Sequence, residues 1–160
     1  MQIMDNEMIK VVLVKPGKSA EALEIPNTLK AKQEIVGGDI EVAYPFADRA
    51  AIICNENGMF LENCMPNRGL RDRNGALYSI LFGDFMIAGL SDDSFCSLSE
   101  EQMKYYLQAY RNPELFCIDR DTGKVGIVRS SQFPSREEFD LCYDKLLANG
   151  GMAAVKELLR

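Results

Sequence analysis

The sequence predicts an α+β fold: an antiparallel, meander-rich sheet of about five to seven strands, with one helix after the first hairpin and further helices toward the C-terminus. Short apolar or alternating segments, separated by glycine, proline and asparagine turn signals, fill the first 90 residues. Beyond them the apolar spacing changes to the helical period, and two serines stand at capping-box positions. The 160 residues, 47% of them hydrophobic, suffice for one packed domain.

The first elements are predicted to be a hairpin, a helix and a third strand. Residues 8–14 are β-branched and almost continuously apolar, and the turn after them returns residues 20–25 antiparallel. A short helix lies between the Pro-Asn pair at 26–27 and the Gly-Gly pair at 37–38, because glycine favours the left-handed conformation at helix ends. Strict alternation over 39–44 then predicts a strand with one buried face.

The middle of the chain contains two Asn-Gly pairs, which are strong hairpin signals. A strand over 50–54 leads to the first pair, at 57–58, so we expect a hairpin at this point. The second pair, at 74–75, precedes an apolar stretch over 76–88. Within that stretch Gly83 is predicted to mark a bulge or a close approach between two strands.

The C-terminal third is predicted to add helices and one more hairpin. Ser99 begins an amphipathic helix, since a glutamine three residues later completes a capping box, and this helix ends a core domain over 8–110. Residues 111–160 form a predicted extension that packs on the core. The extension consists of a hairpin around 121–123, a helix that begins after Ser135 and a short last helix.

Composition excludes several classes of function. Eighteen basic and 24 acidic residues give a formal charge of −6 and a pI near 4.8, which disfavours non-specific binding to nucleic acid. The chain has no histidine, and so it forms no Ser-His-Asp or Cys-His nucleophile and no histidine-ligated metal centre. No cofactor and no catalytic residue is expected, and a protein that works by binding is favoured over an enzyme.

The sequence predicts a cytoplasmic protein. Its acidic first residues are unlike a secretory signal, and its apolar runs are too short to cross a membrane. Five cysteines without a close pair make a disulfide framework or a zinc knuckle unexpected. Cys54 and Cys142 stand among apolar neighbours and are interpreted as small buried hydrophobic residues.

Two partial motifs are interpreted as structural. Residues 119–123 resemble the start of a calcium loop, but the later ligand and glycine positions do not match, and a turn between strands explains them better. Cys64 precedes Arg68 as in some thiolate sites, yet Pro66 removes a backbone donor that an anion cradle requires. A magnesium-dependent hydrolase or nuclease stays open as a third hypothesis, with the carboxylates Asp39, Glu41 and Asp84.

The strongest candidate site is an arginine-rich loop predicted over residues 66–73, within a chain of negative net charge. Arginine grips carboxylate and phosphate with two parallel hydrogen bonds, so the loop is a candidate contact for an anion, a nucleotide or a protein partner. The alternative is a solvated loop whose arginines pair with nearby acids. The predicted binding residues are Asn67, Arg68, Arg71 and Arg73.

Several motifs follow one another in a characteristic order. They are Ile-Lys-Val-Val-Leu-Val-Lys-Pro-Gly at 9–17, Val-Gly-Gly-Asp-Ile-Glu-Val at 36–42, Ile-Cys-Asn-Glu-Asn-Gly at 53–58, Pro-Asn-Arg at 66–68, Leu-Arg-Asp at 70–72 and Phe-Gly-Asp-Phe-Met-Ile-Ala-Gly at 82–89. With these motifs the chain resembles a family of uncharacterised small proteins, a domain of unknown function carried on phages and mobile elements of Gram-positive gut bacteria. The resemblance covers residues 8–110, and it brings no known catalytic residues.

The resemblance implies an accessory role on mobile DNA. The first hypothesis is a non-enzymatic inhibitor of anti-CRISPR or anti-restriction type, which binds a host defence protein or nuclease complex through acidic patches. The alternative is a small-ligand binding protein, such as a sponge for nucleotide signals. In that case Arg68 and Arg71 would grip phosphate, and an aromatic residue such as Tyr44 or Phe85 would stack on the base.

Overall fold

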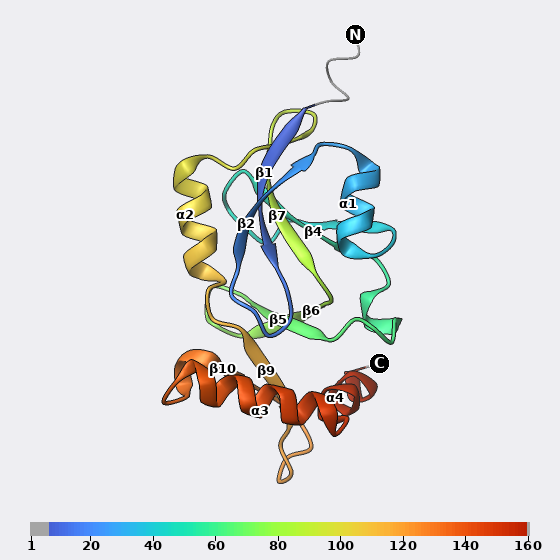
Figure 1. Cartoon of the computed structure of the whole chain (residues 1–160), viewed down its shortest axis with the longest axis vertical. Helices are drawn as coiled ribbons and strands as arrows, with labels where there is room; N and C mark the ends of the chain where they lie inside the picture. The colour runs from blue at the N-terminus through green and yellow to red at the C-terminus, as the bar shows by residue number, and fades with distance from the viewer. Residues whose placement is uncertain (1–6, 160) are drawn as a thin grey trace.

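The structure confirms the α+β fold. It is a computed structural model that describes residues 7–159. A central antiparallel sheet lies between two helices, and a C-terminal unit lies against one end of it (Figure 1). The sheet and its helices are β1 (Met8–Val14), β2 (Glu21–Pro26), α1 (Leu29–Val36), β3 (Ile40–Ala43), β4 (Ala50–Asn55), β7 (Phe85–Leu90), β8 (Phe95–Cys96) and α2 (Glu100–Ala109).

The remaining elements form two hairpins and two helices. They are η2 (Gly58–Phe60), β5 (Pro66–Arg71), β6 (Leu77–Phe82), β9 (Glu114–Ile118), β10 (Val125–Arg129), η3 (Ser130–Gln132), α3 (Arg136–Ala148) and α4 (Gly151–Leu159). Strands β5 and β6 pair with each other, as do β9 and β10. In Figure 1 the first of these hairpins lies between the main sheet and the C-terminal unit.

The main sheet has the order β2-β1-β7-β4-β3, and β8 pairs with the end of β7. All of these pairs are antiparallel. The first two strands form the predicted hairpin, with Val12 opposite Ala22. The sheet is completed by pairings of β7 with β1 and with β4, which bring together segments far apart in the chain. No local turn signal specifies these long-range pairings.

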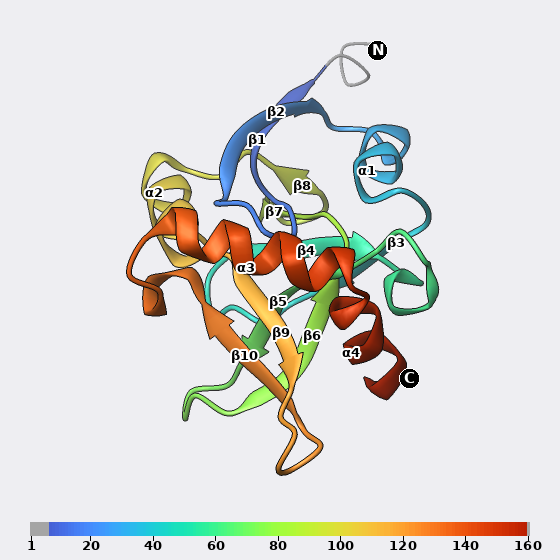
Figure 2. The same cartoon turned by 60° about the horizontal axis from the view of Figure 1, so that its bottom comes forward.

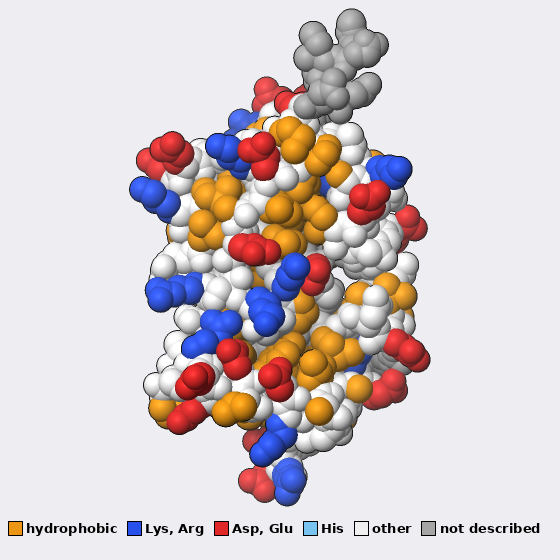
Figure 3. All heavy atoms as spheres, in the orientation of Figure 1, with side chains coloured by type: hydrophobic (Ala, Val, Ile, Leu, Met, Phe, Trp, Pro, Cys, Tyr) orange, Lys and Arg blue, Asp and Glu red, His pale blue; other side chains and the backbone are white. Residues whose placement is uncertain are grey.

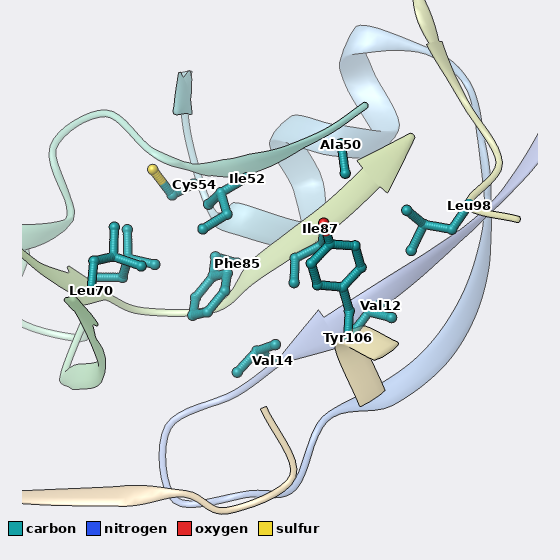
Figure 4. Close-up of a cluster of buried hydrophobic side chains, with 11 residues drawn as sticks. Val12, Val14, Ala50, Ile52, Cys54, Leu70, Phe85, Ile87, Leu98 and Tyr106 are labelled. Atoms are coloured by element: carbon teal, nitrogen blue, oxygen red, sulfur yellow. The ribbon is translucent and has the colours of Figure 1, made fainter. Parts of the chain in front are cut away.

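Both faces of the sheet are buried, which explains why its central strands are almost continuously apolar. Ile52 and Ile87 lie on the face covered by α2, where they form a cluster with Tyr106 (Figure 4). Ile53 and Met86, which are adjacent to Ile52 and Ile87 in their strands, lie on the opposite face, where α1 packs. Successive strand residues alternate between faces, so both layers gain the stabilisation of burial, about 1.5–3 kcal/mol for each large side chain.

The hairpin predicted at Asn57-Gly58 is wrong. Residues 58–60 form a 3₁₀ helix, and the chain leads away from β4 instead of turning back on it. Both edges of β4 already pair, one with β3 and one with β7, so no edge is left for a returning strand. Gly58 is required for close packing, since a Cβ there would lie 2.9 Å from the Phe82 carbonyl oxygen.

The loop predicted over residues 66–73 is also wrong, because residues 66–71 form β5. The turn that follows is the second Asn-Gly pair, which connects β5 to β6 as its signal indicates. The Asp72 carboxylate accepts hydrogen bonds from the backbone N–H groups of Asn74 and Ala76 at 2.8 and 3.0 Å. Gly75 adopts the left-handed conformation with φ of +81°.

Both helices of the core are capped as predicted. Ser99 Oγ accepts from the Gln102 N–H at 3.1 Å, and Gln102 Oε1 accepts from the Ser99 N–H at 2.9 Å, so the capping box is complete. Helix α1 ends at Gly37 with φ of +82°. The predicted close approach at Gly83 is confirmed: its φ is +78°, and a Cβ there would lie 2.9 Å from Cys64 Sγ.

The C-terminal unit has its own apolar cluster. Helix α3 lies across the β9–β10 hairpin (Figure 2), and Phe116, Phe139 and Met152 pack between them. Met65 and Ile80, from the β5–β6 region, pack against the same cluster. The hairpin around 121–123 and the helix start at Ser135 agree with the sequence. The C-terminal unit therefore packs against the β5–β6 region.

The cysteines are all free thiols. Cys54 is buried as predicted, whereas Cys142 is only half-buried. Burial raises the pKa of the Cys54 thiol to about 11, with a smaller contribution from the charge of Glu41. Among residues 7–159, no helix has the length and apolarity needed to cross a membrane.

Candidate functional site: a buried arginine under a tyrosine-lined pocket

Arg68 is the most buried charged side chain associated with a cavity. It lies on β5 with 2% of its surface exposed. Its Nη2 donates to the carbonyl oxygens of Lys18 at 2.6 Å and Tyr110 at 2.9 Å. Its Nη1 donates to Asn67 Oδ1 at 2.9 Å and to the Asn67 carbonyl oxygen at 3.3 Å. The guanidinium thus joins β5 to the β1–β2 turn and to the end of α2.

Asn67 orients the side chain of Arg68 through a hydrogen bond. Its side chain is fully buried, and its Nδ2 donates to the carbonyl oxygens of Val14 at 2.9 Å and Gly83 at 2.7 Å. With both donors used, the amide oxygen faces Arg68 as an acceptor. Asn67 is therefore a positioning residue that fixes the orientation of the guanidinium.

The hydrogen bonding of Arg68 is incomplete. Within residues 7–159, its Nε is the one buried side-chain nitrogen or oxygen that has no hydrogen-bond partner, and no carboxylate pairs with the guanidinium. Burial lowers the pKa of Arg68 to about 10, against the opposing charge of Glu114. The side chain therefore stays cationic at neutral pH. A buried donor without a partner is costly, and such groups call for an explanation.

Arg68 lines a cavity of about 220 Å³ between β5, β6 and α2, which we call the arginine–tyrosine pocket. Tyr78 and Tyr105 are 56% and 66% exposed, so their rings are available to a ligand. A second hollow of about 430 Å³ adjoins the pocket and shares four of its residues. The residues of the pocket used in the argument below are Arg68, Arg71, Tyr78, Tyr105, Tyr110 and Glu114.

Two tyrosines of the pocket have a raised pKa. Burial raises the pKa of Tyr110 to about 12, although the charge of Arg68 opposes the shift. Burial and a 3.1 Å hydrogen bond to Asp48 raise the pKa of Tyr106 as well. The Tyr106 ring packs on Phe46 with 4.7 Å between centroids, and so the tyrosine layer is held in place. Tyr106 is buried, whereas Tyr105 is exposed.

Glu114 is the acidic residue of the pocket, and both of its oxygens are engaged. Oε1 accepts from the Gly69 N–H at 2.8 Å, and Oε2 pairs with Arg129 Nε at 3.3 Å. Arg71 lies at the exposed rim, where its Nη1 donates to the Gly75 carbonyl oxygen at 3.1 Å. Because Glu114 is already paired with Arg129, the arginines give the pocket a net positive charge.

The structure brings together only part of the predicted arginine site. Arg68 and Arg71 both line the pocket, Asn67 supports it, and the exposed Arg73 lies outside it in the β5–β6 turn. The two predicted stacking residues do not line it either, since Tyr44 lies elsewhere and Phe85 belongs to the sheet core.

Sequence reasoning missed Tyr78 and Glu114. The sequence could have placed Tyr78 near the arginines, because the Asn-Gly turn at 74–75 pairs the strand of Tyr78 with β5. Glu114 has no such signal, since its contact with Gly69 depends on how the C-terminal unit packs. The proposed carboxylates Asp39, Glu41 and Asp84 do not form a metal site: within residues 7–159 no three histidine, cysteine or acidic residues are placed to hold an ion.

A comparison with protein families gives one match, in which the model described as "Domain of unknown function (DUF3846)" covers residues 9–111. The match ends close to the point where the C-terminal unit begins, and it includes Arg68, Arg71 and Tyr78 but not Glu114. Neither the curated proteins nor the solved structures gave a match to the chain. An uncharacterised domain family, as the sequence motifs implied, is confirmed.

Proposed function

Since the chain belongs to the DUF3846 family over residues 9–111, and the description of that family names no activity, we propose a function from the pocket. In this proposal the protein binds a nucleotide-type ligand and catalyses no reaction. The observation that carries the proposal is the Arg68 side chain, which lines the arginine–tyrosine pocket and whose buried Nε has no hydrogen-bond partner within residues 7–159. A ligand oxygen that accepts from this donor would remove the cost of leaving it unpaired.

The chemistry of the pocket favours a planar ring attached to an anion. Arg71 at the rim is suited to a phosphate or carboxylate, because a guanidinium offers two parallel donors. The exposed rings of Tyr78 and Tyr105 offer flat surfaces on which a base can stack.

Binding without catalysis is supported by the absence of activated groups around the pocket. The chain has no histidine, and none of its cysteines lines the cavity. Cys64 lies elsewhere, and burial raises the pKa of its thiol, which disfavours the reactive thiolate. Retention of a bound ligand is therefore the simplest use of this site.

The test is calorimetric titration with a panel of nucleotides, starting with AMP, cyclic AMP and cyclic dinucleotides. We expect one of them to bind saturably and the Arg71→Ala and Tyr78→Ala variants to lose at least about tenfold in affinity, the worth of one charge-assisted contact for Arg71 and of one stacked base for Tyr78. Arg73→Ala is the matched control, since Arg73 lies outside the pocket, and it should bind as the wild type does. Absence of binding across the panel, or equal affinity in all variants, would refute the proposal.

We propose that the protein acts in the cytoplasm of a bacterium that carries a phage or mobile element.

A second candidate function, inhibition of a host defence protein of CRISPR or restriction type, is favoured by the solvent face of α3. Glu137, Asp140, Leu141 and Asp144 are exposed there at helical spacing, and so form an acidic stripe around a leucine that is 70% exposed. Exposed hydrophobic side chains also lie between charges on the face shown in Figure 3.

This second function predicts a basic partner surface, such as one that holds nucleic acid. Its test is the rescue of phage growth in a host with an active defence system when the protein is expressed. We expect the double variant Glu137→Lys, Leu141→Ala to lose rescue and Arg73→Ala to retain it. If the wild type rescues growth in no such host, or if the double variant rescues equally, this function is excluded.

A further inference from the structure

Another cavity lies between α3, the end of α1 and the segments 16–18, 63–65 and 83–84. Its volume is about 540 Å³, within the range of small-molecule sites. None of its lining residues is shared with the arginine–tyrosine pocket. The cleft is formed jointly by the family domain, which contributes Lys18 and Asp84, and by the C-terminal unit, which contributes Tyr143 and Asp144.

The walls of this cleft are fixed by specific contacts. Arg136 of α3 donates to Ser19 Oγ at 2.9 Å and to the Gly17 carbonyl oxygen at 3.4 Å, and it pairs with Asp140 at 3.1 Å. The Tyr143 ring packs so closely on the β1–β2 turn that a Cβ at Gly17 would lie 2.8 Å from it. Helix α3 is thereby held at a set position against the turn.

Three oxygen-bearing side chains that line the cleft have unused acceptors. Asp84 is half-buried, and Asp144 is exposed at the mouth. Neither carboxylate forms a hydrogen bond or an ion pair within residues 7–159 that the structure records. Tyr143 is 8% exposed, its hydroxyl has no hydrogen-bond partner in the described part of the chain, and yet this oxygen is not sealed from solvent.

We propose that this cleft binds a small organic amine, with the ammonium group held by Asp84 and Asp144 and the Tyr143 hydroxyl as a further acceptor. An ammonium carries three donors and no acceptor, which matches a site whose free groups are mainly acceptors. The carbon chain of the amine would lie on the apolar part of the lining, which includes Ile35, Met65 and Leu147. Charge-assisted hydrogen bonds of this kind are the strong ones.

The charges around the cleft support an organic cation over the two obvious alternatives. Lys18 also lines the cleft, Asp140 is already paired with Arg136, and the charge of Lys15 acts on Asp84. An anion would meet the carboxylates. A metal ion would need three closely placed ligands, and no such group exists within residues 7–159. A flexible chain with one or two ammonium groups fits the volume of the cleft and the acceptors that line it.

The test is calorimetric titration of the whole chain with putrescine, at constant ionic strength and with Mg²⁺ as a second titrant of the same charge. We expect saturable binding of putrescine and a loss in affinity of about tenfold in both Asp84→Asn and Asp144→Asn, the worth of one charge-assisted hydrogen bond. Asp93→Asn makes the same change of charge outside the cleft and should bind as the wild type does.

The Arg71→Ala variant, which tests the arginine–tyrosine pocket, should leave putrescine binding unchanged, so that the two proposals stand or fall separately. Folding of Asp84→Asn is checked by its melting temperature, and we expect no loss, because burial already disfavours the charged form of this residue. Absence of saturable putrescine binding, equal affinity in the cleft variants and wild type, or equal competition by Mg²⁺ would each overturn the assignment.

Discussion

Asn67 and Arg68 are neighbours in sequence, yet both side chains point into the protein, where Asn67 Oδ1 accepts a hydrogen bond from Arg68 Nη1 at 2.9 Å. Adjacent residues of a regular strand point to opposite faces. Here the register of β5 with β6 shifts between Pro66 and Arg68. Such an irregularity re-aims a side chain, and it directs the arginine under the tyrosine-lined pocket.

The first prediction concerns the stability that Arg68 provides. Arg68→Ala should lower the free energy of unfolding by about 2–4 kcal/mol, because the carbonyl oxygens of Lys18 and Tyr110 lose a buried donor. Urea denaturation measures this. Arg73→Ala is the exposed control and should stay within about 0.5 kcal/mol of the wild type. A small effect of Arg68→Ala would mean that the guanidinium does not join these segments.

The second prediction concerns the attachment of the C-terminal unit. Glu114→Ala should cost about 1–3 kcal/mol, because the Gly69 N–H then lacks its acceptor and Arg129 its partner. Hydrogen exchange at the Gly69 amide is the local measurement, and we expect faster exchange in the variant. Unchanged protection of this amide would show that the contact between β9 and β5 contributes nothing.

The third prediction separates backbone strain from steric contact at two glycines. Gly75→Ala and Gly83→Ala both place a Cβ at positive φ, which costs about 1 kcal/mol. At Gly75 nothing lies within 4 Å of the new atom, whereas at Gly83 Cys64 Sγ lies 2.9 Å away. Gly83→Ala should therefore be the more destabilising, and its cost should be smaller when it is measured in a Cys64→Ala background, where the nearest side-chain atom is Cβ at 3.3 Å. Equal melting temperatures for the two single variants would contradict this.

The fourth prediction concerns pH. Burial raises the pKa of Cys54 to about 11 from an ordinary value near 9.0. Below pH 9 the thiol is protonated in both states, and between about 9 and 11 only the unfolded chain loses the proton. The contribution of the protonated Cys54 thiol to the free energy of unfolding should therefore be complete below pH 9 and should be lost as the pH rises toward 11. The free energy of unfolding of Cys54→Ala should fall less over this window, and an identical slope would exclude the effect.

The sequence predicts those parts of the fold that depend on local chemistry. The capping box at Ser99, the left-handed stop at Gly37 and the turn at Gly75 each involve residues a few positions apart, and all three occur in the structure. The Asn-Gly pair at 57–58 has the same signal without the same result, because β4 is already paired on both edges. The pairing of β4 with β3 and β7 prevents a hairpin there, and no local motif predicts this pairing.

The candidate site divides in the same way. The arginine-rich segment can be recognised from its composition. That it forms a strand cannot be recognised from the sequence, because Pro66, Asn67 and Gly69 are poor strand formers. The burial of Arg68 depends on carbonyl oxygens contributed by Lys18 and Tyr110, which lie far away in the chain. A pattern of residue types does not specify such acceptors, so the sequence suggests an exposed loop where the structure has a buried cation.

The central claim is that Arg68 Nε donates to a ligand in the arginine–tyrosine pocket, and the ¹H–¹⁵N resonance of its Nε–Hε group tests it most directly. Assignment rests on the Arg68→Lys variant, in which the signal is absent. On titration with the nucleotide that binds, we predict a saturable shift of this resonance that Tyr78→Ala weakens and Arg73→Ala leaves intact. A resonance that stays fixed while the nucleotide saturates the protein would contradict the account.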